Sequence, residues 1–122
     1  MYRSGEVEVA LEEGLSIVRL LGEHDLSTQQ LVAARLADLI ETGNPLVFDV
    51  SQATFVDSSV VHAVMKARDE LAKRGLPVAI VVPDSTARVV SKLIELAKID
   101  QHILIVRSHD EAKQMLLPRP AD

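Results

Sequence analysis

The chain opens with two stretches whose hydrophobic positions repeat as they do in β-strands. Val7, Val9 and Leu11 alternate with glutamates, which predicts a half-buried strand. Glu13-Gly14 is typical of a turn, and the apolar positions within residues 17–21 predict a second strand. We expect these two strands to form an antiparallel hairpin.

A helix is predicted next. Ser27 stands three residues before Gln30, the spacing of a capping box, and Leu26 and Leu31 occupy the positions of a hydrophobic staple. Apolar residues then recur at helical spacing and predict a buried stripe of Val32, Leu36, Leu39 and Ile40. Residues 42–45, Thr-Gly-Asn-Pro, are expected to end this helix.

Short apolar runs alternate with helical patterns over the rest of the chain. Residues 46–50, 78–82 and 102–106 predict core strands, and residues 51–56 predict a loop. Helices are predicted to start at residues 57–59, 83–85 and 108. Apolar residues at helical spacing mark the first two of these helices, namely Val60, Val64, Ala67 and Leu71 in one and Val89, Leu93, Leu96 and Ala97 in the other.

The elements follow the order β-β-α-β-α-β-α-β-α, which predicts a single α/β domain. Strands joined through single helices are usually parallel with right-handed crossovers, so the sheet should be mixed, with about five strands and about four helices. We expect the domain to span residues 1–122, with an ordered core from about 6 to 117. The short tail with Pro118 and Pro120 should fray.

Composition narrows the classes of function. The formal net charge is −5, there is no cysteine, and aromatic residues make up 2%. An acidic chain without a basic run is a poor candidate for nucleic-acid binding, and the lack of cysteine fits the cytoplasm. The longest charge-free stretches, residues 26–34 and 75–83, are far shorter than the about 20 apolar residues that span a membrane.

No motif for catalysis or metal binding is present. The histidines His24, His62, His102 and His109 lack the spacing of metal pairs and are expected to be exposed or capping. The glycines form no dinucleotide-binding or phosphate-binding loop. Asp25, Asp49 and Asp57 could meet at one sheet edge and hold Mg²⁺, although caps and a strand-end position explain them better. We therefore predict no catalytic residue, no cofactor and no metal.

Ser58 and Ser59 stand where a loop is predicted to enter a helix. Unsatisfied backbone N–H groups and the helix dipole favour a negative group at such a point. A phosphate on Ser58 would add a charge of about −1.5 to −2, beside an apolar patch expected from Val60 and Val61. A partner that docks on this patch would sense that charge. Alternatively, both serines only cap the helix, which is the commoner role.

Two motifs at this edge of the predicted sheet give the chain a resemblance to a known family. Leu21-Gly22-Glu23-His24-Asp25-Leu26 is followed by Phe48-Asp49-Val50-Ser51 and by Phe55-Val56-Asp57-Ser58-Ser59. Together they resemble the STAS domain, specifically the bacterial anti-sigma factor antagonists. Val82-Pro83 and Ile99-Asp100 also match, and the resemblance covers about residues 6–117.

The resemblance implies a non-enzymatic switch. Ser58 matches the phosphoacceptor, while Asp25, Asp57 and Ser59 match positions at or near the docking surface. The implied partner is an anti-sigma factor with a GHKL-type serine kinase fold, which releases its sigma factor when the antagonist binds it. Phosphorylation would stop this binding, and a PP2C-type phosphatase would restore it.

The sequence departs from the commonest family pattern directly after Ser59. Most phosphorylated antagonists continue Gly-Leu-Gly, whereas this chain continues Val60-Val61-His62, and His24 replaces a usually apolar residue. These departures favour an alternative, a structural STAS module in which Ser58 is not modified. Such modules include stressosome-like scaffolds and soluble partners of membrane transport systems. Nucleotide binding ranks last, because no glycine-rich loop or basic residue stands at this edge.

Overall fold

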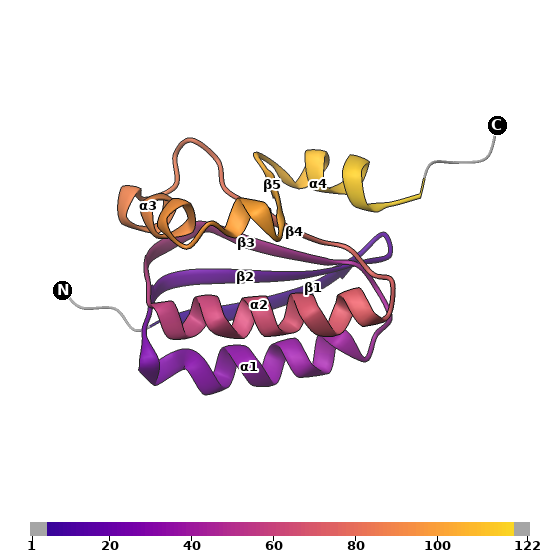
Figure 1. The fold of residues 1–122 in the computed structure, drawn as a ribbon, viewed down its shortest axis with the longest axis horizontal. Helices are drawn as coiled ribbons and strands as arrows, with labels where there is room; N and C mark the ends of the chain where they lie inside the picture. Colours follow the sequence, from indigo (N-terminus) through magenta and orange to yellow (C-terminus); the bar gives the residue numbers. More distant parts are fainter. Residues whose placement is uncertain (1–4, 119–122) are drawn as a thin grey trace.

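The five strands lie side by side in the order in which they occur along the chain. The computed structural model describes residues 5–118 (Figure 1). The strands are β1 (Glu6–Glu12), β2 (Leu15–His24), β3 (Leu46–Val56), β4 (Val78–Val81) and β5 (Leu104–Val106). The helices are α1 (Leu26–Ile40), α2 (Ser58–Lys73), α3 (Arg88–Leu96), the 3₁₀ helix η1 (Ile99–Gln101) and α4 (His109–Leu116).

The predicted element order and the mixed sheet are confirmed. β1 pairs antiparallel with β2, and the other three neighbouring pairs are parallel. The strands β2 and β3 are longer than expected, because they pair with each other from Ser16 opposite Leu46 to His24 opposite Val56. The predicted loop at residues 51–56 is therefore wrong. The backbone groups of this segment bond to the end of β2, which also continues beyond its own apolar run.

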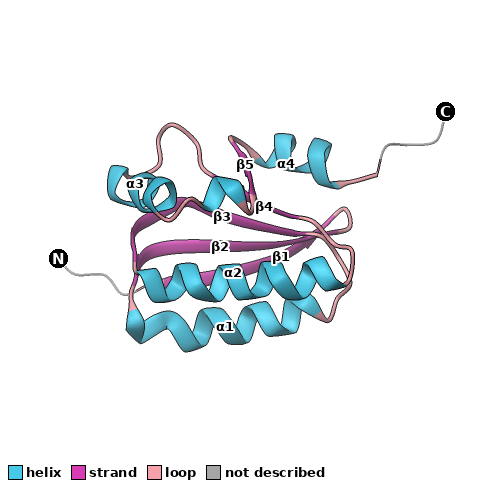
Figure 2. Ribbon diagram, viewed as in Figure 1, coloured by secondary structure: helices cyan, strands magenta, loops and turns pink. Residues whose placement is uncertain are grey.

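Helices cover both faces of the sheet, and each face has its own apolar core (Figure 2). On the first face, α1, α2 and α3 pack on β2, β3 and β4 around the fully buried Phe48. On the second face, α4 is the one helix of residues 5–118 that covers the sheet, through Ala112 and Leu116. The predicted buried stripe of α1 is confirmed residue by residue. In α2, the apolar residues at helical spacing, Val60, Val64, Ala67 and Leu71, are the buried ones.

Three expectations about packing are wrong. β1 is an edge strand with little cover, so Val9 is 42% exposed and Leu11 is 63% exposed instead of half-buried. Helix α3 begins at Arg88 and not at residues 83–85, because Thr86 instead closes a turn back to Pro83. This later start accompanies a different phase, in which α3 buries Val90 and Ile94 and leaves Val89 and Leu96 exposed.

The last strand is also shorter than its apolar run. His102, which ends η1, and Ile103 occupy the beginning of the run 102–106, and only residues 104–106 pair with β4. Ile103 is buried, although it lies outside the strand. The expected frayed tail lies outside the described residues from position 119 onward.

Candidate functional site

The candidate site lies at the carboxyl edge of the sheet, where β2 and β3 lead into α1 and α2. His24 and Val56 are the last residues of their strands and lie opposite each other. The next residues, Asp25 and Asp57, therefore come to the same edge. The backbone N–H of Asp57 donates to the carbonyl oxygen of His24 over 2.7 Å, which fastens the two strand ends together.

Asp25 is the N-cap of α1. Its carboxylate accepts a hydrogen bond from the backbone N–H of Ser27 over 2.9 Å, and the hydroxyl of Ser27 donates to the same oxygen. Ser27 as the capping residue is therefore a wrong prediction, and so is the staple that depended on it. Leu26 is 70% exposed, because it is the first helical residue and points away from the core.

Asp57 caps α2 in the same way, as predicted. Its carboxylate accepts from the backbone N–H of Ser59 over 2.7 Å. This hydrogen bond lowers the pKa of the Asp57 carboxyl, while the nearby charge of Asp25 acts in the opposite direction. The site thus presents two helix N-termini, each capped by an ionised carboxylate.

The two serines differ in their access to solvent. Ser58 is the first residue of α2 and is exposed. Ser59 is half-buried, and its hydroxyl oxygen is buried with no hydrogen-bond partner among residues 5–118. Of the two hydroxyls, the one on Ser58 is therefore open to a modifying enzyme.

The expected apolar patch beside the serines is only partly at the surface. Val60 is fully buried in the first core, so its placement in an exposed patch is wrong. Residues two positions apart lie on nearly opposite sides of a helix, so Val60 faces the sheet because Ser58 faces solvent. Val61 is half-buried and lines a narrow cleft between α2 and α3.

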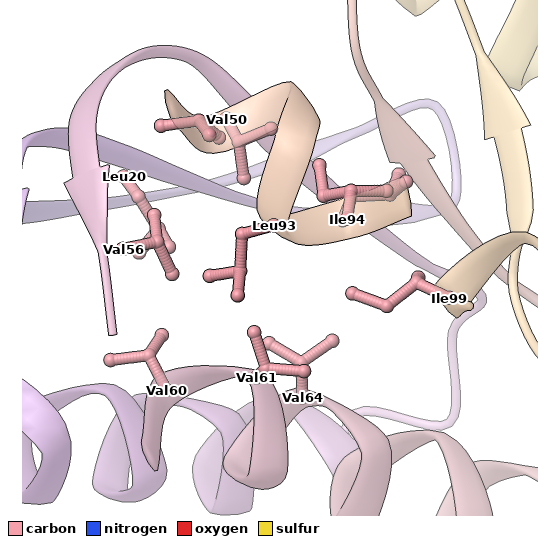
Figure 3. Close-up of a pocket in the computed structure, with 11 residues that line it drawn as sticks. Leu20, Val50, Val56, Val60, Val61, Val64, Leu93, Ile94 and Ile99 are labelled. Carbon is pink, nitrogen blue, oxygen red and sulfur yellow. The ribbon is translucent and has the colours of Figure 1, made fainter. Parts of the chain in front are cut away.

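This cleft is lined by apolar residues. Figure 3 shows Val61 and Val64 of α2 opposite Leu93 and Ile94 of α3. The enclosed space is about 20 Å³, close to what a single water molecule requires. A bound nucleotide does not fit in it. Val61 and Leu93 are half-buried, so they form the part of the cleft that solvent reaches.

The third aspartate of the suggested Mg²⁺ site lies elsewhere. Asp49 is buried within β3, where its carboxylate bonds to His109 over 2.6 Å and to the backbone N–H of Ser51 over 2.9 Å. It is therefore neither at the carboxyl edge nor a strand-end residue. Within residues 5–118, no group of three or more histidines, aspartates or glutamates is arranged to hold a metal ion.

One residue of the site escaped the sequence analysis. His24 was expected to be exposed or capping, yet it is fully buried. Its ring lies against Thr28 of α1 and two backbone carbonyl oxygens, which satisfy both ring nitrogens. The sequence offered one signal, a histidine in a position that is usually apolar in the family it resembles.

The family model of the STAS domain matches residues 6–112 of this chain. The search of curated protein sequences found no match to this chain. The part of the chain that the structure describes has no helix with the length and apolar character needed to cross a membrane.

Three solved structures have a similar fold. An anti-sigma factor antagonist from Mycobacterium paratuberculosis has a TM-score of 0.82 and 22% identity, over 94% of this chain and 96% of that one. A putative anti-sigma factor antagonist from Thermotoga maritima has a TM-score of 0.79 and 14% identity, over 92% and 95%. The Bacillus cell fate determinant SpoIIAA in its phosphorylated form has a TM-score of 0.66 and 17% identity, over 89% and 97%.

Proposed function

The chain belongs to the STAS domain family, and we propose that it is a non-enzymatic, cytoplasmic anti-sigma factor antagonist. It binds an anti-sigma factor with a GHKL-type serine kinase fold and thereby releases a sigma factor. The kinase phosphorylates Ser58, which ends the binding, and a PP2C-type phosphatase reverses this step. The solved structures with a similar fold include proteins named as anti-sigma factor antagonists, which supports this choice within the family.

The observation that carries the proposal is the exposed Ser58 at the edge of the sheet where two acidic helix caps lie. Ser58 begins α2, and the capping residues Asp25 and Asp57 both lie at its edge of the sheet. A partner that docks here must complement two carboxylates already. A phosphate would add about −1.5 to −2 further charges at the same point.

The size of this effect is sufficient for a switch. Two like charges at 4 Å repel by about 1 kcal/mol in water and by about 4 kcal/mol at the dielectric of a protein interface. Every 1.4 kcal/mol corresponds to about tenfold in affinity. One phosphate therefore weakens docking by about one to three orders of magnitude without any change of fold.

Val60 is compatible with phosphorylation of Ser58. The commonest family pattern has glycine at this position, and a larger side chain that pointed towards the acceptor would crowd it. The Val60 side chain is fully buried against the first core and therefore takes no space beside the Ser58 hydroxyl. The kinase meets only the backbone of this residue.

The docking surface combines charge with apolar contacts. Leu26, which is 70% exposed, directly follows Asp25. Phe55, which is 38% exposed, lies near the end of β3, two residues before Asp57. Val61 adds the rim of the cleft between α2 and α3. Exposed apolar side chains next to a polar centre are typical of a protein interface.

A structural STAS module remains the second candidate because of His62. This residue is exposed on α2 one turn after Ser58, where the family pattern allows a glycine and a close approach of the partner. In that case the same edge is a permanent interface to a scaffold or to a transport system, and Ser58 only begins the helix.

The deciding experiment is a pull-down from the native organism with the wild type, Ser58→Asp and Ser58→Ala, analysed by mass spectrometry. We expect the wild type and Ser58→Ala to capture a GHKL-type kinase and Ser58→Asp to lose it. If all three capture the same scaffold or transport proteins, the structural module is correct and the switch is wrong.

A further inference from the structure

His24 connects three elements through its ring. Its Nε2 atom lies 3.1 Å from the carbonyl oxygen of Glu6 in β1 and 3.0 Å from that of Leu21 in β2. Its Nδ1 atom lies 3.1 Å from the hydroxyl oxygen of Thr28 in the first turn of α1. No part of the residue is exposed to solvent.

These contacts assign the tautomer of the ring. Carbonyl oxygens only accept hydrogen bonds, so Nε2 must carry a proton and donate it to Glu6 and Leu21. In the neutral ring, Nδ1 then accepts from the hydroxyl of Thr28, whose other acceptor is the carbonyl oxygen of Asp25 at the longer distance of 3.3 Å. Burial favours this neutral form and lowers the pKa of His24, although the two carbonyl contacts and the nearby Asp25 act in the opposite direction.

The backbone of His24 extends the connection to both helix caps. Its carbonyl oxygen accepts from the N–H of Asp57, the cap of α2. The next residue in the chain is Asp25, the cap of α1. A shift of His24 therefore moves both carboxylates that flank Ser58.

The residue before β1 packs directly against this ring. A Cβ atom on Gly5 would lie 2.7 Å from both Cε1 and Nε2 of His24 and would also collide with the carbonyl oxygen of Glu23. Such distances are well below van der Waals contact. The residue at position 5 therefore has to be glycine for the chain to lie against the ring.

We propose that His24 is a positioning residue at the carboxyl edge of the sheet. Its hydrogen bonds to β1, β2 and α1 hold the capping residues Asp25 and Asp57 in place at the edge that carries Ser58. An apolar residue would fill the same volume but would provide no directed contact to any of the three elements. The consequence for partner binding rests on the proposed function, whereas the positioning itself does not.

Three variants test this proposal. His24→Leu keeps a buried side chain and removes the donor to both carbonyl oxygens. His24→Gln retains an amide N–H donor at a similar reach. Leu116→Ala is the control for a general loss of stability, because Leu116 is buried on the second face of the sheet, away from the edge.

The measurement is amide hydrogen exchange, followed by NMR, at Asp57, Ser27 and Ser59, whose N–H groups make the bonds of the edge. Relative to amides of β4, we expect exchange in His24→Leu to be at least about fivefold faster, the effect of losing about one hydrogen bond. His24→Gln should restore the wild-type rates. Leu116→Ala should leave the ratio of edge exchange to β4 exchange as in the wild type, even where its melting temperature is as low as that of His24→Leu.

Equal exchange ratios in His24→Leu and Leu116→Ala would overturn the proposal, because His24 would then only fill the core. Failure of His24→Gln to restore the rates would do the same. These readings need no partner. A result in which His24→Leu loosens the edge while Ser58→Asp leaves the kinase bound therefore supports the positioning role and contradicts the proposed switch.

Discussion

The Nε2 atom of His109 lies 2.6 Å from Oδ2 of Asp49, so the first residue of α4 is attached to the centre of the sheet. Asp49 is buried, and Arg19 of β2 approaches the same oxygen at 3.4 Å. The pair joins α4 to two strands on the second face, where only Ala112 and Leu116 contribute buried apolar contacts from the helix. The buried carboxylate thus orients α4 on this face.

Asp49→Asn should lower the free energy of unfolding by about 1.5–3 kcal/mol at neutral pH, as expected for hydrogen bonds to a charged group. Burial opposes the charge of Asp49, but the hydrogen bonds from Ser51 and His109 outweigh it and lower the pKa of this carboxyl. The unfolded chain therefore takes up this proton first as the pH falls below about 4, and the stabilisation disappears towards the lower folded pKa.

Urea unfolding between pH 2.5 and pH 7 measures this effect. The wild type should lose stability more steeply in acid than Asp49→Asn. Asp84→Asn is the matched control, because the side chain of Asp84 is 98% exposed. Identical acid profiles for Asp49→Asn and Asp84→Asn would show that the buried pair contributes nothing.

Ser58→Ala should abolish phosphate incorporation, whereas Ser59→Ala should leave most of it. The hydroxyl of Ser58 is exposed and that of Ser59 is buried without a partner. Phosphopeptide mass spectrometry after incubation with the captured kinase measures the difference. Ser59→Ala should also be neutral for stability, within about 0.5 kcal/mol, because it removes an unsatisfied polar atom. Phosphate found on Ser59 would contradict the assignment.

Val60→Ala should mainly lower stability, and Val61→Ala should mainly weaken partner binding. Removing the buried Val60 side chain should lower the free energy of unfolding by about 2 kcal/mol and leave partner affinity within about twofold. Removing Val61 from the rim of the cleft should cost less than about 1 kcal/mol of stability but weaken partner binding at least about fivefold. Thermal unfolding and calorimetric titration with the captured kinase separate the two, and equal affinities would exclude the cleft from the interface.

His24→Gln should reduce the dependence of the free energy of unfolding on pH below about 6.5, the ordinary pKa of histidine. Burial lowers the pKa of His24 from 6.5, so the unfolded chain is protonated at a higher pH than the folded chain. The neutral ring therefore stabilises the fold fully above about 6.5, and this contribution is lost as the pH falls towards the folded pKa. His102→Gln, at an exposed histidine, should keep the wild-type profile. An unchanged profile in His24→Gln would contradict a neutral buried ring.

Local patterns predicted the parts of the site that depend on neighbouring residues. Asp57 as the cap of α2 and the helical spacing of apolar residues from Val60 to Leu71 were predicted, because cap chemistry and helical periodicity act within a few residues. Ser27 was assigned as a cap because it fits the spacing. The carboxylate of Asp25 is the actual cap, because β2 continues to His24 and moves the start of the helix.

By itself, the sequence determined the order of the elements, the parallel connections and the position of Ser58 at a helix start. These follow from periodicity, capping residues and the handedness of short connections, which are local properties. The tertiary structure alone decided that Val60 is buried, that α3 turns Val90 inward, and that His24 and Asp49 are buried with partners from other strands and helices. A buried polar group is stable only where distant segments supply its hydrogen bonds, and the chain acquires those neighbours only when it folds.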